Sequence, residues 1–322
     1  MSLKSIIALT LFFIIMLPVA SSDTNENFTV NNEDPVMITG DYFLYDLDMS
    51  IMIEGMESDE DVVEVLVNSN SGMRMEYGGE SCLQTGWEDC SIGLMYWNLN
   101  ITIVYDESMG VDNDRAIMEM RTESTIVMSG LHSEDTTIRE MEMWFSMDGE
   151  NYHSESIDTE VSTSTKLSDE PELVAIGDVW SVETQEETIT NSKSRMNGDS
   201  WEHEDEIIEN STTVETSTAV SVLEVTTNAG NFVTMKIKSE ESNSSEYDYT
   251  YVAENGMPVK INGYSENGEL MMSMTLSEYS WSEENNGQSD SDDDALMPGF
   301  GLIGTIFATT MAIIVYNTKM DC

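Results

Sequence analysis

Methionine is the most unusual of the residues in this chain that could do chemistry, with 25 among 322 residues. Thioethers two positions apart point the same way on a β-strand, and soft sulfur ligands suit Cu(I). Methionine also fills β-sheet cores, because its side chain is flexible and polarizable. We favour core filling, because no histidine or cysteine cluster accompanies the Met-x-Met pairs. These pairs are Met73 and Met75, Met118 and Met120, Met141 and Met143, and Met272 and Met274.

The other side chains that catalyse reactions are few or lack a recognisable arrangement. The chain has three histidines, His132, His153 and His203, and none lies at the helical spacing of a hydrolytic zinc site. No Gly-x-Ser-x-Gly elbow or phosphate-binding glycine loop occurs. The 62 acidic residues make chance pairs of carboxylates inevitable, so such pairs do not indicate a glycosidase. We expect surface histidines, no catalytic residue, no metal ligand and no cofactor, and hence no enzyme.

Two of the three cysteines flank a short loop. Cys82 and Cys90 enclose Gly86 and Trp87. In an exported protein, a close pair of this kind favours a disulfide over a metal site. Closing so short a loop contributes about 2.5 kcal/mol by the chain-entropy relation.

The charge of the chain is strongly one-sided. Basic residues number 12 and acidic residues 62, which gives a formal net charge of -50. Such a charge repels phosphate backbones and anionic headgroups, so we expect no nucleic-acid partner. Screening at high ionic strength would relieve the self-repulsion, which indicates a salt-rich medium. A dedicated cation-binding role is the alternative.

The N-terminal residues 1–22 have the features of a secretory signal peptide. Lys4 supplies a positive charge, an apolar stretch runs from Ile6 to Leu17, and Pro18 precedes small residues that a peptidase could cut. An uncleaved anchor is the alternative, and Pro18 argues against it. We expect residues 23–41 to be an N-terminal tether.

The C-terminal part predicts a membrane anchor on a stalk. Residues 296–316 carry no charge, and as a helix they would run roughly 31 Å, which matches a hydrocarbon core of about 30 Å. Residues 283–295 are acidic and low in complexity, typical of a disordered stalk. Residues 317–322 would form a cytoplasmic tail, where Cys322 stays reduced.

The start of the apolar segment resembles a known sorting signal. Pro298, Gly299 and Phe300 follow the acidic stalk and open the apolar segment. This arrangement resembles the PGF-CTERM signal of archaeal surface proteins. The resemblance implies an archaeosortase as partner, which cleaves the chain and transfers it to a membrane lipid. That family usually ends in a basic cluster, whereas Lys319 alone follows here.

Residues 42–282 show a period-two pattern that predicts long antiparallel strands. Apolar side chains alternate with polar ones from Phe43 to Ile53, from Met95 to Tyr105, from Met141 to Met147 and from Leu270 to Leu276, and Met118 to Met128 follow a similar pattern. Turn pairs separate such runs, at Asp148-Gly149, Asn255-Gly256, Asn262-Gly263 and Asn267-Gly268. We predict a mainly β ectodomain in a curved sheet or half-barrel, with two halves meeting near residues 166–176 and one C-terminal transmembrane helix.

The second half of this ectodomain is similar to a family of carriers. Gly177-Asp178-Val179-Trp180 opens the segment, residues 226–237 lead into a strand, and Gly256-Met257-Pro258-Val259-Lys260 continues a meander. These features resemble the last strands of LolA-like lipoprotein carriers, whose curved sheets hold an acyl chain. The resemblance implies an apolar or lipid-like ligand. The helices that cap the sheet in that family are not evident in this sequence.

Four acceptor sequences for N-glycosylation agree with export, at Asn27, Asn100, Asn210 and Asn243. The sequence therefore predicts a glycosylated protein on the outer face of the cytoplasmic membrane. A lipid-like ligand on the curved sheet is the leading hypothesis. A structural or adhesive module without a small ligand is the alternative, and copper handling is the third.

Overall fold

The fold was obtained as a computed structural model. It describes residues 28–31, 39–48, 62–67, 71–80, 82, 87, 90–105, 111–147, 150–168, 170–242 and 244–280. All regular elements in these residues are β-strands. The strands are β1 Thr29–Asn31, β2 Tyr42–Asp48, β3 Val62–Val67, β4 Gly72–Gly79, β5 Ser91–Tyr105, β6 Val111–Ser129, β7 His132–Met147, β8 Glu150–Lys166, β9 Leu173–Ala175, β10 Val179–Met196, β11 Glu202–His203, β12 Ile207–Thr227, β13 Gly230–Glu241, β14 Tyr247–Ala253, β15 Pro258–Tyr264 and β16 Leu270–Ser280.

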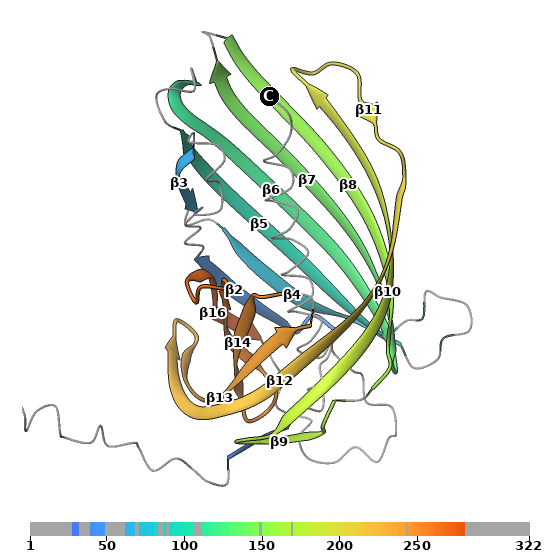
Figure 1. The fold of residues 1–322 in the computed structure, drawn as a ribbon, viewed down its shortest axis with the longest axis vertical. Coiled ribbons are helices and arrows are strands. Elements are labelled where there is room, and N and C mark those ends of the chain that lie inside the picture. The colour runs from blue at the N-terminus through green and yellow to red at the C-terminus, as the bar shows by residue number, and fades with distance from the viewer. Residues whose placement is uncertain are drawn as a thin grey trace, which may run out of the picture.

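One antiparallel sheet closes on itself to form a barrel (Figure 1). Its order is β10-β12-β13-β14-β15-β16-β2-β4-β5-β6-β7-β8, and β10 pairs in turn with β8. Twelve strands make up the ring, while β11 pairs with β10 and β3 with β5. The predicted mainly β, antiparallel fold is confirmed. The predicted half-barrel is wrong, because β8 and β10 pair along residues 154–166 and 184–196.

A second, two-stranded sheet lies at the lower end of the barrel in Figure 1. It consists of β1 and β9, whose residues Val30 and Val174 are fully buried. They pack with Ala219, Met235 and Val252 of β12, β13 and β14. The segment predicted as the meeting point of two halves, residues 166–176, contains β9 and connects two strands of the same barrel.

The main hydrophobic core follows the predicted alternation. On β4, Met73, Met75 and Tyr77 are buried, whereas the residues between them are partly exposed. The same alternation occurs on β2 and β5. One face of each strand therefore points into the barrel and the other toward its surroundings.

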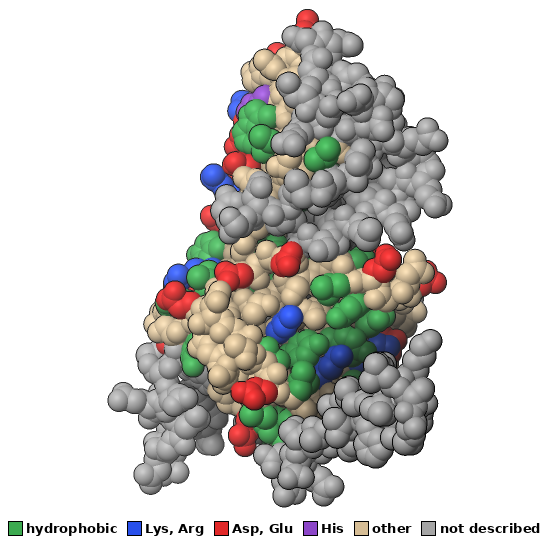
Figure 2. Space-filling view, turned by 90° about the vertical axis from the view of Figure 1, so that its left-hand side faces the viewer, with side chains coloured by type: hydrophobic (Ala, Val, Ile, Leu, Met, Phe, Trp, Pro, Cys, Tyr) green, Lys and Arg blue, Asp and Glu red, His purple; other side chains and the backbone are tan. Residues whose placement is uncertain are grey.

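On the face of the molecule in Figure 2, acidic side chains are scattered, and apolar ones gather in the lower half.

Most of the predicted strands agree with the structure, and the turns at Asn255-Gly256 and Asn267-Gly268 are confirmed. The predicted turn at Asp148-Gly149 and residues 49–53 of the first apolar run lie outside the described residues. Strands β5, β6, β7 and β16 contain the predicted apolar runs, and β2 covers the first part of the run that begins at Phe43. Asn262-Gly263 is not a turn, since it lies inside β15. There the Asn262 amide oxygen accepts a 2.9 Å hydrogen bond from Ser273, and a Cβ at Gly263 would lie 3.1 Å from Asp248 Oδ1. Close packing explains this glycine.

Several predicted segments lie outside the described residues. They are the signal peptide (1–22), most of the tether (23–41), the stalk (283–295), the apolar segment (296–316) and the tail (317–322). In the part of the chain that the structure describes, no helix has the length and hydrophobicity to span a bilayer.

Candidate functional site: the inner wall of the barrel

Strand pairing identifies the side chains on the inner face of the barrel. Directly paired residues of antiparallel strands share a face. Tyr45, Met73, Trp97 and Arg139 on this face are 1%, 1%, 7% and 6% exposed, whereas Ile138 on the opposite face is 42% exposed. One row of such partners runs through Tyr45, Met73, Trp97, Thr122, Arg139, Asp158 and Ser192.

The inner wall divides into two sectors of opposite character. The apolar sector comprises inner-face residues of β15, β16, β2, β4 and β5, with the adjoining parts of β6 and β7. The polar sector comprises those of β8, β10, most of β7, and parts of β6, β12, β13 and β14. Members of the apolar sector include Phe43, Tyr45, Leu47, Met73, Met75, Met95, Trp97, Leu99, Ile101, Met118, Met120, Met141, Ile261, Met274 and Leu276. Members of the polar sector include Thr122, Ser124, Asp135, Thr137, Arg139, Ser156, Asp158, Glu160, Ser162, Glu186, Thr188, Glu215, Ser217, Ser239, Glu241 and Asp248.

Much of the polar sector is hydrogen-bonded across strands. Ser124 Oγ and Thr137 Oγ1 are 2.6 Å apart, and Thr137 Oγ1 is 3.1 Å from Asp135 Oδ1. Ser162 and Thr188 hydroxyls are 2.9 Å apart across the pair β8–β10. Buried polar groups need such partners, because an unpaired one costs about 1–3 kcal/mol. These contacts satisfy the polar wall away from its border.

The border between the sectors is different, because polar atoms there have no partner. It runs between Thr122 and Met120 on β6, and between Arg139 and Met141 on β7. Arg139 Nη1 lies 3.8 Å from Asp158 Oδ2, and both side chains are largely buried. Within the described residues, Arg139 Nε, Thr122 Oγ1 and Ser156 Oγ are buried and have no hydrogen-bond partner. Thr122 on β6 is the direct partner of Arg139, and Ser156 lies one row away from Arg139 on β8, so the three residues are neighbours on the inner wall.

Carboxyl groups of the polar sector are held in an unfavourable environment. Burial raises the pKa of Asp135 to about 7, with repulsion from Glu160 and Glu186 acting in the same direction. Burial likewise raises the pKa of Asp248 to about 7, and Glu215 and Glu241 add to the shift.

Burial also raises the pKa values of the carboxyl groups that neighbour these two aspartates, namely Glu160, Glu186, Glu215 and Glu241. Among the described residues, acidic side chains do not converge in a group that could hold a metal ion.

Four methionines meet on the inner wall beside this border. Met118 pairs with Met143, and Met120 pairs with Met141, across β6 and β7. Met118 and Met120 are buried, whereas Met141 and Met143 are partly exposed. The methionine quartet therefore extends the apolar sector with flexible side chains next to Arg139.

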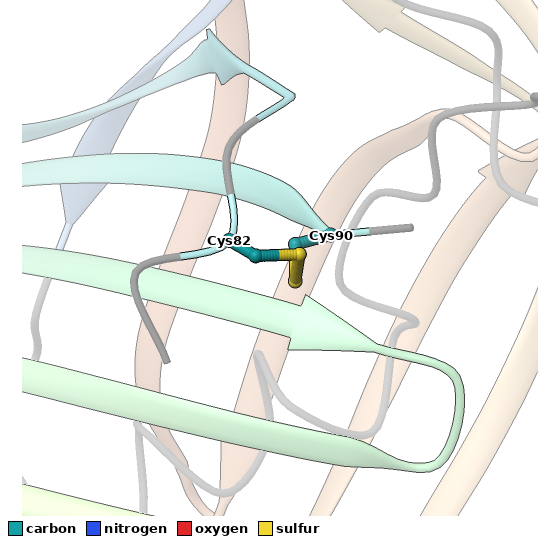
Figure 3. The surroundings of a disulfide bond; sticks show 2 residues. All are labelled: Cys82 and Cys90. Atoms are coloured by element: carbon teal, nitrogen blue, oxygen red, sulfur yellow. A yellow bond between two sulfur atoms is a disulfide. The ribbon is translucent and has the colours of Figure 1, made fainter. Parts of the chain in front are cut away.

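The predicted disulfide is present in the structure. Cys82 and Cys90 are bonded, with their Cα atoms 5.0 Å apart, in the connection between β4 and β5 (Figure 3). Cys90 directly precedes the first residue of β5. The bond therefore fastens the end of a strand that contributes to the apolar sector.

The predicted glycosylation sites fall in different places. Asn100 lies on the outer face of β5, where its amide donates a 3.0 Å hydrogen bond to Glu119 Oε1. Asn210 is exposed on β12. Asn27 and Asn243, and the sorting residues Pro298, Gly299 and Phe300, lie outside the described residues.

The histidines lie apart from the inner-wall border. His132 and His203 are exposed. His153 is one-third exposed, stacks on Trp144 at a centroid distance of 5.0 Å, and lies 3.1 Å from Glu142 Oε2. The expected surface position is correct for His132 and His203, and His153 is only partly covered.

Sequence reasoning missed the border residues Thr122, Arg139 and Ser156. A signal was present for Arg139, since it continues the period-two row of Met141, Met143 and Phe145 and therefore places a cation on an apolar face. Ser156 had no such signal, because β8 is mostly polar and its apolar residues Ile157 and Val161 lie on the other face. Its inner position follows only from pairing with Met141.

Comparison with known proteins gives matches only among solved structures. No protein-family model matches the sequence, and no curated protein matches it significantly. A β-barrel-like protein of a domain of unknown function from Brucella abortus has a TM-score of 0.41 at 8% identity, covering 77% of this chain and 100% of that one.

Two further structures cover the same share of this chain. A candidate exported protein with a YmcC-like fold from Bacteroides fragilis has a TM-score of 0.30 at 11% identity, with 77% of this chain and 99% of that one covered. A candidate lipoprotein from Parabacteroides distasonis has a TM-score of 0.26 at 12% identity, with the same coverage of 77% and 99%.

Proposed function

We propose that this protein is a membrane-anchored binding protein of the cell exterior whose barrel takes up a lipid-like ligand. The observation that carries the proposal is the division of the inner wall into an apolar and a polar sector. An amphipathic ligand matches such a wall, because its chain and its head need opposite surroundings. Each methylene moved from water to the apolar sector contributes about 0.8 kcal/mol.

The methionine quartet supports an adaptable site for the apolar chain. Methionine side chains have three rotatable bonds and repack around ligands of different shape. Met141 and Met143 are partly exposed, so they are the members of the quartet that a ligand reaches first. The second half of the ectodomain resembles LolA-like carriers, which hold acyl chains, and this resemblance supports the proposal.

The location outside the cell is supported by the two ends of the sequence. Residues 1–22 have the features of a signal peptide, and residues 296–316 are long and apolar enough for a membrane anchor. The resemblance to the PGF-CTERM signal at Pro298, Gly299 and Phe300 implies an archaeal source and an archaeosortase as the processing partner. The proposed role is binding without catalysis, and the net charge of -50 disfavours nucleic acid.

Native mass spectrometry of the protein from its own membrane tests this function. We expect a mass increment that dissociates as a lipid-like molecule, and a C-terminus shortened near Pro298. A barrel that carries no ligand, and that binds no amphiphile after delipidation, would leave the structural or adhesive role instead. An intact peptide that includes Tyr316 would exclude sortase-type processing.

Copper binding is a second candidate, and the methionine quartet is the observation that favours it. Four paired thioethers form a soft, cysteine-free environment that Cu(I) accepts. The double variant Met141→Leu, Met143→Leu keeps the apolar volume and removes two sulfur ligands. Cu(I) titration compares the affinity of this variant with that of the wild type. Equal affinities would end the copper hypothesis, and a large loss of affinity in the variant would favour it.

A further inference from the structure

We infer that the border of the inner wall is a head-group site, in which Arg139, Thr122 and Ser156 bind an uncharged, oxygen-bearing group of the ligand. This inference rests on the proposed function and specifies its ligand class, namely amphiphiles with hydroxyl or ester heads. Free fatty acids and cationic amphiphiles fall outside that class.

The unpartnered polar atoms are the first line of support. Arg139 and Thr122 are 6% and 8% exposed, yet Arg139 Nε and Thr122 Oγ1 have no hydrogen-bond partner within the described residues. Ser156 Oγ, on the neighbouring strand, is in the same state. Elsewhere in the polar sector the hydroxyls of Ser124, Thr137 and Ser162 are paired. Each unmet donor costs free energy that a ligand oxygen would recover.

The arrangement of these atoms matches a head attached to an apolar chain. Thr122 pairs with Arg139, and Arg139 pairs with Asp158, in one row across β6, β7 and β8. In the adjacent row Met120 pairs with Met141, and Met141 with Ser156. A head between Arg139 and Ser156 therefore has its chain directed along the methionine quartet.

The surrounding charges decide which head is accepted. Asp158 lies 3.8 Å from Arg139 Nη1 and offsets its charge. Glu160 and Asp135 occupy neighbouring rows of the same wall, and buried carboxyl groups there already repel one another. An anionic head would add to this repulsion, whereas a cationic head would face the guanidinium. An uncharged hydroxyl or ester accepts from Arg139 without either penalty.

Access to the site requires a side chain to move. The three polar atoms are covered, while Met141 in the next row is only partly buried. Met141 is the direct partner of Ser156, and its thioether chain changes rotamer readily, so we expect it to move when a ligand enters and then to pack on the ligand chain. Entry of a head group therefore requires a local rearrangement of the side chains around these atoms.

Calorimetric titration with three amphiphiles that share a dodecyl-length chain tests the inference. The probes are monododecanoyl glycerol, dodecanoate and dodecyltrimethylammonium, each below its micellar concentration. We expect the glycerol ester to bind about tenfold more tightly than either charged probe. All three should show a negative heat-capacity change, because each buries an apolar chain. Equal affinities would overturn the inference while leaving the proposed function intact, and no binding of any probe would overturn both.

Two conservative variants separate head-group binding from a structural role. Thr122→Val and Ser156→Ala each remove a hydroxyl that has no partner, so folding stability should not fall. Each should weaken the glycerol ester several-fold and leave the charged probes unchanged. Thr125→Val, on the outer face of β6, is the matched control. Unchanged affinity of both variants for the ester would contradict the inference.

Arg139 must be replaced together with Asp158, because removing Arg139 alone would leave the buried Asp158 carboxylate without its counter-charge. Arg139→Met with Asp158→Asn keeps the local charge balanced and preserves the apolar stem of the side chain. We expect this double variant to lose the tenfold preference for the ester. A double variant that melts like the wild type and keeps the preference would overturn the role of Arg139.

Discussion

Tyr45 Oη donates a 2.8 Å hydrogen bond to the backbone carbonyl of Pro258, which lies 213 positions later in the sequence. Tyr45 is on β2 and Pro258 opens β15, with β16 between the two strands. The bond is buried and lies inside the apolar sector. It joins the first strand of the barrel in the sequence to one of the last. It satisfies the one polar atom of a side chain that is 1% exposed.

Tyr45→Phe removes this donor and leaves the Pro258 carbonyl buried without it. We expect the free energy of unfolding to fall by about 1 kcal/mol, with little change in the fold. Urea denaturation measures the effect. Tyr96→Phe is the control, because Tyr96 is 40% exposed, and a loss as large in this variant would show that the effect does not come from the buried bond.

Met274→Ala tests whether the methionines of the apolar sector serve as packing. Met274 is fully buried and pairs with Ile261 and Leu47 on either side. We expect a loss of about 2–5 kcal/mol, the usual cost of truncating a buried methionine. Leu270→Ala, at a residue 41% exposed on the same strand, should cost far less. Denaturation midpoints at equal slope give both values.

Closure of the barrel can be tested by cross-linking β8 to β10, which form the seam at which the ring closes. Thr163 of β8 and Glu187 of β10 are register partners on the outer face. Cysteines at such positions fall within the Cα separation that a disulfide accepts. We expect Thr163→Cys with Glu187→Cys to oxidise readily in a Cys322→Ser background, as judged by mass spectrometry.

The control pair for this seam is Thr163→Cys with Glu183→Cys. Its second cysteine lies about 13 Å further along β10, at 3.3 Å per residue, and should not cross-link. Equal reactivity of the two pairs, or none in the matched pair, would contradict a paired seam between β8 and β10.

The raised pKa values of the buried carboxyl groups predict that the free energy of unfolding falls as pH rises. Burial raises the folded-state pKa of Asp135 and of Asp248 from 3.8 to about 7. The folded state therefore holds protons that the unfolded state releases. The stabilising contribution of these protons is complete below about pH 4 and disappears as pH rises through about 7.

Asp135→Asn and Asp248→Asn remove this dependence at one site each. Both should raise the free energy of unfolding near neutral pH and change it much less near pH 4. Urea unfolding across this pH range is the measurement. Glu140→Gln, at an exposed position on the outer face of β7, is the control, and a wild-type slope in both aspartate variants would refute the assignment.

Removing the disulfide should destabilise the protein without altering the barrel order. Cys82→Ser with Cys90→Ser reopens the connection between β4 and β5, and the chain-entropy relation gives a loss of about 2.5 kcal/mol. Thermal melting with and without reductant measures it. A double variant that melts at the wild-type temperature would show that this bond contributes nothing.

Many of the strands, and the face of each that is apolar, can be predicted from the order of residues alone. Alternation of Met73 and Met75, or of Met95 and Trp97, with polar neighbours has one physical meaning, because side chains on a strand alternate between faces. The short loop between Cys82 and Cys90 also follows from local spacing. Each of these features is decided within a few residues.

Closure of the ring and the border on its inner wall depend on how the strands pair in three dimensions. Strand β8 is mostly polar, and its Ile157 and Val161 lie on the other face, so no hydrophobic pattern reveals that Ser156 and Asp158 face inward or that Glu155 pairs with Arg195 of β10. Thr122, Arg139 and Ser156 become neighbours because three strands pair in one register. Register depends on the whole sheet, since a shift of one residue exchanges the two faces, and that choice is not contained in any single strand.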